Sequence, residues 1–262
     1  MHVSHTIPEW LERRRALAGQ SIGFVPTMGA LHRGHASLVE RCRHENRVVA
    51  VSIFVNPTQF NDPKDLDRYP RTIENDLALL RDLGADEVLL PTQSELYPRG
   101  YRFRIEAESF TGTMEGAHRP GFFQGVMTVV LKLLNLVRAD RAYFGEKDYQ
   151  QMKLVTELAA EFFVGTEIVP CETVREPSGL AASSRNALLS RPSREKAAVL
   201  YRALTGARTC AEAKTMLEQQ GYAVDYVEES WGRRFAAAYL DGIRLIDNVP
   251  LSSNGDRDAA LP

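Results

Sequence analysis

The strongest constraint on the fold is an alternation of short apolar segments with segments of helical spacing. Residues 21–27 (SIGFVPT) and 47–55 (RVVAVSIFV) are nearly continuous apolar runs. Such runs are expected of parallel strands that are covered on both faces. Between them, apolar side chains recur at helical spacing within residues 35–46. Together these segments predict a β-α-β unit.

The same alternation continues along the chain. Helices are predicted over residues 72–83, 123–137 and 149–163, and strands over residues 86–90 and 141–144. Alternating strands and helices predict an α/β fold with a doubly wound parallel sheet. Sheets of this kind bind ligands beyond the carboxyl ends of their strands. The loops that join strand to helix are therefore where a functional site is expected.

The character of the chain changes past about Asn186. Helices are predicted over residues 193–206 and 211–219, followed by a small meander of strands over residues 223–227, 235–240 and 243–245 with a turn at Asp241-Gly242. This pattern predicts a second, smaller α+β domain. We place the two domains at residues 1–178 and 179–262, and expect the polar tail from Ser252 to be frayed.

Charge and cysteine usage exclude several classes of protein. Lys and Arg number 32 against 34 Asp and Glu, for a net charge of −2, so the basic excess of a nucleic-acid-binding protein is missing. No uninterrupted apolar run in the sequence approaches the roughly 18 residues of a membrane span. The 3 cysteines lie far apart and form no CxxC pair, which is typical of a reducing compartment. We therefore expect a cytoplasmic protein without nucleic-acid or membrane partners.

The most informative segment is PTMGALHRGH at residues 26–35, where the first strand passes into the first helix. Gly29 and Gly34 permit close backbone approach, and the free N–H groups of a helix start favour an anion such as phosphate. His32 and His35 are three residues apart, so both can donate hydrogen bonds to that anion. An HxxH pair alone is more often structural or metal-binding. Neither GxGxxG nor a P-loop motif occurs in the chain, so the usual dinucleotide and P-loop interpretations are not supported.

Three further loops carry polar groups at comparable places. FVNPTQF (54–60) presents Asn56 and Gln59 at the end of a strand, and a turn capped by Asn56 is the competing interpretation. FGEKDYQQ (144–151) offers Lys147 as a point charge for phosphate, and Asp148 as a helix cap or a ligand of a ribose hydroxyl. SSRN (183–186) combines two hydroxyls with a guanidinium, although by itself it is most simply a polar loop.

These motifs together resemble one enzyme family. PTMGALHRGH, SIFVNPTQF, RYPRT, FGEKDYQQ, SSRN and RLIDN occur in the order found in the pantoate–β-alanine ligase family. The resemblance runs from about Ser21 to Asn248. The pattern HxGH by itself would indicate only the wider nucleotidyltransferase superfamily.

The resemblance implies an activity and an architecture. Members of this family join pantoate to β-alanine with ATP and Mg²⁺ through an enzyme-bound pantoyl adenylate, and release pyrophosphate and then AMP. They have a Rossmann-like N-terminal domain and a smaller C-terminal lid domain, and they usually form homodimers.

The resemblance also implies roles for individual residues. His35 is the family's acid residue, and the implied catalytic set is His32, His35, Lys147 and Arg185. The implied ATP-binding residues are Pro26, Thr27, Met28, Gly29, Ala30, Leu31, His32, Arg33, Gly34, His35, Gly145, Glu146, Lys147, Asp148, Val174, Ala182, Ser183, Ser184 and Arg185. Pantoate and β-alanine are assigned to Asn56, Gln59 and Gln151, and no protein ligands of Mg²⁺ are identified. The chemistry predicts cations around phosphate and neutral amides around pantoate, because a cation on the attacking carboxylate would weaken the nucleophile.

The chain departs from the family pattern at three positions. Phe122 stands where members commonly have His, Ser178 where they have Asp, and Ala182 where they have Met or Leu. We expect the first change to reshape the pantoate side, and the other two to weaken the anchoring of the SSRN loop or widen its surroundings. Two alternatives follow: an adenylyltransferase of the same fold with a different acceptor, and a nucleotide-binding protein that has lost catalysis.

Overall fold

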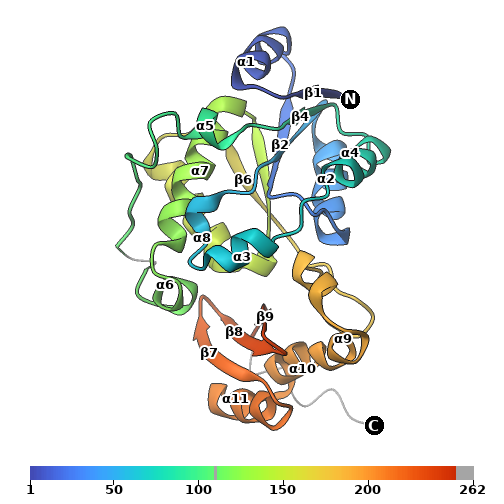
Figure 1. Cartoon of the computed structure of the whole chain (residues 1–262), viewed down its shortest axis with the longest axis vertical. Coiled ribbons are helices and arrows are strands. Elements are labelled where there is room, and N and C mark those ends of the chain that lie inside the picture. The colour runs from blue at the N-terminus through green and yellow to red at the C-terminus, as the bar shows by residue number, and fades with distance from the viewer. Residues whose placement is uncertain (109–110, 252–262) are drawn as a thin grey trace. The chain divides into compact units, whose positions relative to one another are not determined.

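The computed structural model describes residues 1–108 and 111–251, and the chain divides into two compact units (Figure 1). Unit 1 comprises Met1–Val174 and unit 2 comprises Arg175–Pro262. The division therefore falls after Val174, whereas the sequence placed it after Ser178. The tail that was expected to fray lies outside the described residues.

Unit 1 is built on a sheet of six parallel strands. They are β1 (His2–Ser4), β2 (Ile22–Thr27), β3 (Val48–Ile53), β4 (Glu87–Leu89), β5 (Arg141–Gly145) and β6 (Glu167–Cys171). Their order in the sheet is β1-β4-β3-β2-β5-β6, and every neighbouring pair is parallel. The predicted doubly wound α/β fold is confirmed, while β1 and β6 had not been predicted.

Helices cover both faces of this sheet. They are α1 (Ile7–Ala16), α2 (Arg33–Glu45), α3 (Pro63–Arg68), α4 (Ile73–Asp82), α5 (Gln93–Leu96), α6 (Met114–His118), α7 (Phe122–Val137) and α8 (Tyr149–Glu161), with short 3-10 turns η1 (Pro57–Gln59) and η2 (Glu146–Asp148). One buried cluster joins α1, α7 and α8 to the sheet, and a second joins α2 and α4 to its other face (Figure 1). Both faces of the strands are therefore buried, which explains their continuous apolar runs.

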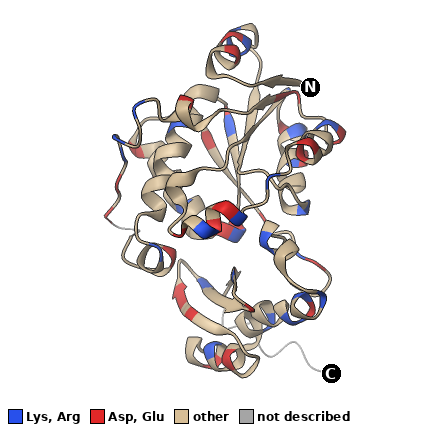
Figure 2. Ribbon diagram, in the orientation of Figure 1, with Lys and Arg blue, Asp and Glu red and all other residues tan. Residues whose placement is uncertain are grey.

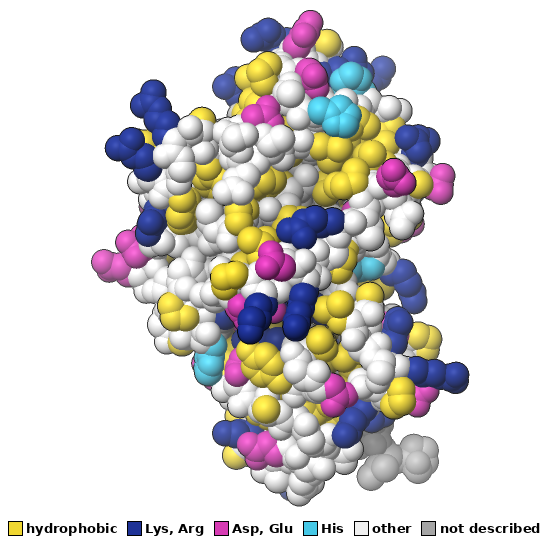
Figure 3. Space-filling view, viewed as in Figure 1, with side chains coloured by type: hydrophobic (Ala, Val, Ile, Leu, Met, Phe, Trp, Pro, Cys, Tyr) yellow, Lys and Arg dark blue, Asp and Glu magenta, His cyan; other side chains and the backbone are white. Residues whose placement is uncertain are grey.

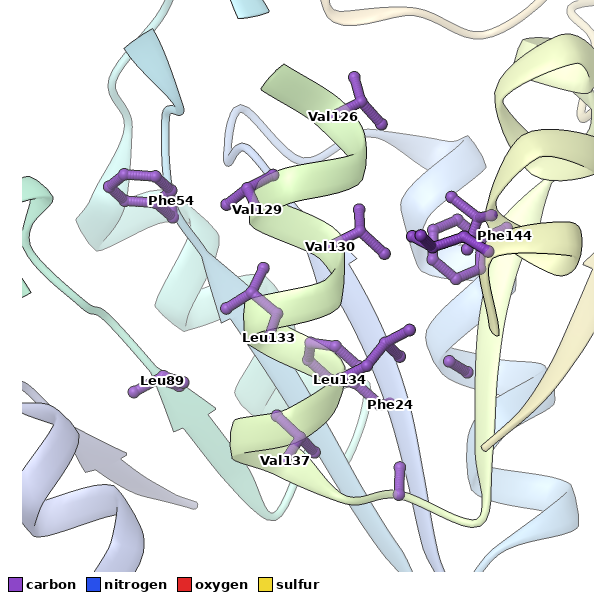
Figure 4. Close-up of a cluster of buried hydrophobic side chains, with 14 of the residues drawn as sticks. Phe24, Phe54, Leu89, Val126, Val129, Val130, Leu133, Leu134, Val137 and Phe144 are labelled. Atoms are coloured by element: carbon purple, nitrogen blue, oxygen red, sulfur yellow. The ribbon is translucent and has the colours of Figure 1, made fainter. Parts of the chain in front are cut away.

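Helix α7 forms the centre of the larger cluster. Its side chains Val126, Val130 and Leu134 are at most 6% exposed, and they pack with Phe24 and Phe144 from the sheet (Figure 4). The ribbon of α7 is almost free of charged residues, whereas α1, α2 and α4 carry both signs (Figure 2). A helix that is apolar on nearly all sides must be buried, and α7 provides a rigid support for the loops beside it.

The order of the strands sets the position of the candidate site. The chain runs from β2 outward through β3 and β4, and later returns to the other side of β2 with β5 and β6. The order in which strands are added therefore reverses between β2 and β5, the place where α/β sheets bind ligands. The loops after β2, β3 and β5 carry the first three sequence motifs and leave the same edge of the sheet.

Unit 2 is a small α+β arrangement. Strands β7 (Ala223–Ser230), β8 (Arg233–Leu240) and β9 (Ile243–Pro250) form an antiparallel meander, which packs with α10 (Val199–Gly206) and α11 (Cys210–Gln219). The predicted helix over 193–206 is in fact two helices, α9 (Arg191–Ala197) and α10, that break at Ala198. The predicted turn at Asp241-Gly242 is confirmed, since both residues have left-handed φ angles of 50° and 77°. Before it in the chain, η3 (Ser184–Leu188) contains most of the SSRN motif.

The surface is mixed in character. On the face drawn in Figure 3, basic and acidic side chains are interspersed with hydrophobic ones.

Among the described residues, no helix combines the length and apolar character that crossing a bilayer requires.

Candidate active site

The loop after β2 folds tightly against α4. Its backbone is left-handed at Gly29 (φ 78°) and at Ala30 (φ 49°), a conformation that non-glycine residues rarely adopt. The buried carboxylate of Asp76 stabilises this turn, because it accepts hydrogen bonds from the N–H groups of Ala30 (2.9 Å) and Leu31 (2.8 Å). Asp76 was not among the residues predicted from the sequence. The only indication of Asp76 in the sequence was its place four residues after Thr72, the last residue of the RYPRT motif.

His32 is the N-cap residue of helix α2, and its side chain caps that helix. Its Nδ1 accepts a hydrogen bond from the backbone N–H of Gly34 at 3.1 Å. An Nδ1 that accepts carries no proton, so the neutral ring carries its proton on Nε2. The His35 ring lies with its centroid 4.1 Å from that of His32, at an angle of 39°. The N-terminus of α2 therefore presents two neighbouring imidazoles, as the motif predicted.

Both imidazoles are neutral at pH 7 in this structure. Burial lowers the pKa of His35 to about 3, with further lowering from His32 and Lys147. Burial also lowers the pKa of His32 to about 4, where Lys147 lowers it further and Asp148 opposes the shift. Part of each side chain is exposed, but Nδ1 of His35 is buried without a hydrogen-bond partner among the described residues. Before a nucleotide binds, desolvation therefore opposes the protonation of both histidines.

Lys147 and Asp148 lie in η2, directly after β5. The Lys147 side chain is 18% exposed and its Nζ lies 3.9 Å from Oδ1 of Asp148. The charge of Lys147 lowers the pKa of both histidines, so the loops after the neighbouring strands β2 and β5 lie near each other. Asp148 does not cap α8 with its side chain, which is 47% exposed. Asp148 therefore occupies the N-cap position of α8, as the capping interpretation predicted, but without a side-chain capping hydrogen bond.

Gln59 brings the loop after β3 to the same place. Its Nε2 donates a hydrogen bond to Sδ of Met28, in the loop after β2, at 3.0 Å. The side chain is 9% exposed, and its Oε1 accepts a hydrogen bond from Nδ2 of Asn56 at 3.0 Å. The amide has a second N–H donor besides the one directed at Met28, and this is the group that a carboxylate or hydroxyl ligand would use.

Asn56 is almost completely buried and fully hydrogen-bonded. Its Nδ2 also donates to the carbonyl of Gly125 at 3.2 Å, and its Oδ1 accepts from the hydroxyls of Tyr97 and Thr58, both at 3.0 Å. The side chain also caps η1, as the competing interpretation predicted. Both N–H groups of the Asn56 amide thus form hydrogen bonds within the protein, and one of these bonds holds the side chain of Gln59 in place.

The two glutamines at the start of α8 differ in their surroundings. Gln150 is buried and joins α8 to α6: its Oε1 accepts from the N–H of Glu115, and its Nε2 donates to the carbonyl of Thr113, both at 3.1 Å. Gln151 is half-buried, and no side-chain hydrogen bond of Gln151 is found within the described part of the chain. The sequence analysis assigned Gln151 to pantoate and overlooked Gln150.

The remaining predicted ATP-binding residues fall into two groups. Pro26 and Thr27 end β2, and Gly145 and Glu146 lie at the end of β5, so they are at the same sheet edge as the histidines. Val174 is the last residue of unit 1, while Ala182, Ser183, Ser184 and Arg185 belong to unit 2 and are half-buried. In that loop Ser183 accepts from the N–H of Arg185 at 3.3 Å, and Asn186 donates to the carbonyl of Ala181 at 3.0 Å. Ala182 therefore lies in a loop that is held by its neighbours.

The site suits a magnesium ion that arrives with a nucleotide. Within residues 1–108 and 111–251, no group of three or more His, Cys, Asp or Glu side chains is arranged to hold a metal. Mg²⁺ is usually bound by one or two carboxylates together with substrate phosphates. The exposed carboxylate of Asp148 beside Lys147 fits that requirement, whereas Asp76 is occupied by backbone N–H groups.

Comparisons with known proteins agree on one family. The family model described as pantoate-beta-alanine ligase matches residues 1–250. A pantothenate synthetase from Bdellovibrio bacteriovorus is 50% identical over 238 residues, which cover 91% of this chain and 94% of that protein. One from Legionella pneumophila is 47% identical over 252 residues, covering 96% and 100%.

Solved structures give the same result. The pantoate-beta-alanine ligase from Francisella tularensis, crystallised as a complex with beta-gamma ATP and beta-alanine, matches with a TM-score of 0.92 and 42% identity, covering 95% of this chain and 97% of that one. The pantothenate synthetase from Thermus thermophilus matches with a TM-score of 0.88 and 42% identity, covering 95% and 99%.

Proposed function

Because this chain belongs to the pantoate–β-alanine ligase family, it is an ATP-dependent ligase that condenses pantoate with β-alanine, and we propose that the side chains after β2, β3 and β5 of unit 1 carry out the first step. In this step a carboxylate oxygen of pantoate attacks the α-phosphorus of ATP. The bond from that phosphorus to the β-phosphate oxygen breaks, and pantoyl adenylate and pyrophosphate result. The observation that carries the proposal is the pair of imidazoles, 4.1 Å apart, at the N-terminus of α2.

The histidines stabilise charge on the phosphates. His32 has its proton on Nε2, because Gly34 donates to Nδ1, and so it donates a hydrogen bond to a phosphoryl oxygen as a neutral group. His35, beside it, acts as the acid when the negative charge of ATP raises its pKa from about 3. Lys147 supplies a positive charge to the phosphates. The family resemblance implies Arg185 as a further phosphate-binding cation. Mg²⁺ bound to ATP neutralises further phosphate charge.

Neutral amides hold pantoate. Gln59 and Gln151 donate to its carboxylate and hydroxyls, which orients the attacking oxygen without a cation that would reduce its nucleophilicity. Asn56 supports this arrangement through its hydrogen bond to Gln59 Oε1.

The second step requires no nucleophile from the enzyme. The neutral amine of β-alanine attacks the carbonyl carbon of pantoyl adenylate, the bond to the bridging oxygen breaks, and AMP leaves with that oxygen. A proton is lost from the attacking nitrogen. The three free cysteines are not needed, and Cys42 and Cys171 are buried.

Assembly and location follow the family resemblance. The ligase forms a homodimer and works in the cytoplasm. Three unpaired cysteines among the described residues support a reducing compartment. Light scattering on the purified protein tests the dimer.

Oxygen labelling tests the adenylate. Pantoate labelled with oxygen-18 in its carboxylate is converted with ATP, Mg²⁺ and β-alanine, and the AMP is analysed by mass spectrometry. One labelled oxygen in each AMP is expected, because the bridging oxygen leaves with the nucleotide. Label in inorganic phosphate, with ADP as the nucleotide product, would instead indicate an acyl phosphate and refute the proposal.

A further inference from the structure

Arg119, directly after α6, is held against an aromatic ring. Its Cζ lies 3.7 Å from the centroid of the Phe122 ring at the start of α7, and Phe122 is 8% exposed. The Arg119 side chain is 16% exposed and lies 3.4 Å from the carboxylate of Glu115, so its guanidinium is largely removed from water. A planar guanidinium that is stacked and ion-paired in this way has a restricted orientation.

That orientation directs Arg119 to the backbone of Gln59. Nη2 of Arg119 donates to the carbonyl oxygen of Gln59 at 3.1 Å, which is a charge-assisted hydrogen bond. Nearby, Asn61 donates to the carbonyl of Pro120 at 2.6 Å. The segment that follows α6 is therefore tied to the loop that carries Gln59 at two places.

The same segment also contacts the start of α8. The N–H of Glu115, the ion-pair partner of Arg119, donates to the side chain of Gln150 at 3.1 Å. Gln150 immediately precedes Gln151. Residues 113–122, which we name the α6 brace, thus link the backbone of one proposed pantoate-binding glutamine to the neighbour of the other.

From these contacts we propose that Arg119, held by its stack on Phe122, is a positioning residue that sets the spacing of Gln59 and Gln151 and so the affinity for pantoate. The inference rests on the proposed function. Arg119 itself touches the carbonyl of Gln59, and its effect on the substrate passes through that contact. The ring of Phe122 fixes the plane of the guanidinium.

Steady-state kinetics with four single variants and one double variant tests this role. Arg119→Ala removes the hydrogen bond to Gln59, and Phe122→Leu removes the ring while keeping an apolar side chain. Phe122→Tyr keeps the ring face. The matched control is Phe123→Leu, since Phe123 is 1% exposed, lies beside Phe122 in the same helix, and shows no stacking on Arg119 in the described structure.

We expect Arg119→Ala to raise the KM for pantoate roughly 10- to 100-fold, the scale of a lost charge-assisted hydrogen bond, with the KM for ATP unchanged. Phe122→Leu raises the pantoate KM about 3- to 10-fold, and Phe122→Tyr restores it. Phe123→Leu lowers the melting temperature without changing the pantoate KM. In the Arg119→Ala background, Phe122→Leu adds no further increase, because the two side chains act through one contact.

The inference would be overturned if Arg119→Ala changed the KM for pantoate and the KM for ATP equally, or if Arg119→Ala and Phe122→Leu had additive effects on the pantoate KM. It would also be overturned if Phe123→Leu raised the pantoate KM as much as Phe122→Leu. If Arg119→Ala does not fold, Phe122→Leu and Phe122→Tyr still decide the question. Measurements on the wild-type protein distinguish failure of the inference about Arg119 from failure of the proposed function. A wild type that does not use pantoate refutes both, whereas pantoate use with a normal KM in the variants refutes only the role of the brace.

Discussion

Because the pKa of His35 is low in the folded protein, the free energy of unfolding should decrease in acid. A side chain at position 35 that does not titrate should make this decrease smaller. In the unfolded chain an imidazole binds a proton below about pH 6.5. In the folded protein His35 stays neutral until the pH approaches about 3. Between these two values the unfolded state binds more protons, so stability falls as the pH falls. Above pH 6.5 the histidine makes no such difference.

The size of the effect follows from the gap between the two pKa values. One pH unit corresponds to about 1.4 kcal/mol for a single proton. From pH 6.5 to pH 5 the folded protein therefore loses at most about 2 kcal/mol of stability through His35. His35→Gln removes this titration and should reduce the loss between pH 7 and pH 5 by that amount.

Tryptophan fluorescence can report on unit 1 by itself. The chain has 2 tryptophans, the fully buried Trp10 in unit 1 and Trp231 in unit 2. In a Trp231→Phe background, urea unfolding followed by Trp10 gives the free energy of unit 1 at each pH. His44→Gln, at an exposed position in the last turn of the same helix, is the control for loss of a surface imidazole. A loss between pH 7 and pH 5 that is the same in His35→Gln as in the parent would refute the burial argument.

Three further substitutions have defined outcomes. Gly125→Ala places a Cβ 2.3 Å from the carbonyl oxygen of Thr58, so we expect about 1–3 kcal/mol of destabilisation by urea unfolding and a raised pantoate KM, whereas Gly206→Ala, in a helix with open space, should leave both properties unchanged. Asp76→Asn replaces one acceptor oxygen with an amide that cannot accept from the loop after β2, and should raise the KM for ATP roughly tenfold; an unchanged value would show that the loop holds its shape without Asp76. Gln59→Ala should harm pantoate use more than ATP binding in steady-state assays, and a loss confined to ATP affinity would assign Gln59 to the wrong substrate.

The sequence predicted the parts of the fold that local pattern determines. The strands β2, β3 and β5 are continuous apolar runs, and the helices between them have clear periodicity, so the doubly wound sheet and its strand-end loops could be inferred. The break at Ala198 could not, because residues 193–206 are compatible with one helix and only packing separates α9 from α10. Strand β7 was predicted to end at residue 227 but continues through polar residues to Ser230. An antiparallel sheet can be buried on one face only, so polar residues are compatible with its strands.

The candidate site was predictable where residue types carry the chemistry. Histidines at a helix start and amides at a strand end are visible in sequence. The supporting residues are not, because their partners are distant in the chain: Asp76 contacts a loop 45 and 46 residues before it, and Arg119 contacts Gln59 across 60 residues. The charge of the histidines was also not predictable, since it depends on burial that only the folded chain creates.

Exchange of labelled pyrophosphate into ATP tests the central claim most directly. Purified protein is incubated with ATP, Mg²⁺ and labelled pyrophosphate, with pantoate, without it, and with other small hydroxy acids in its place, and β-alanine is omitted throughout. The account predicts exchange with pantoate alone, and a 10²- to 10⁴-fold slower exchange in His35→Ala, roughly the scale of a lost acid or oxyanion donor. Exchange without pantoate, exchange only with a different acid, or near-normal exchange in His35→Ala would contradict it.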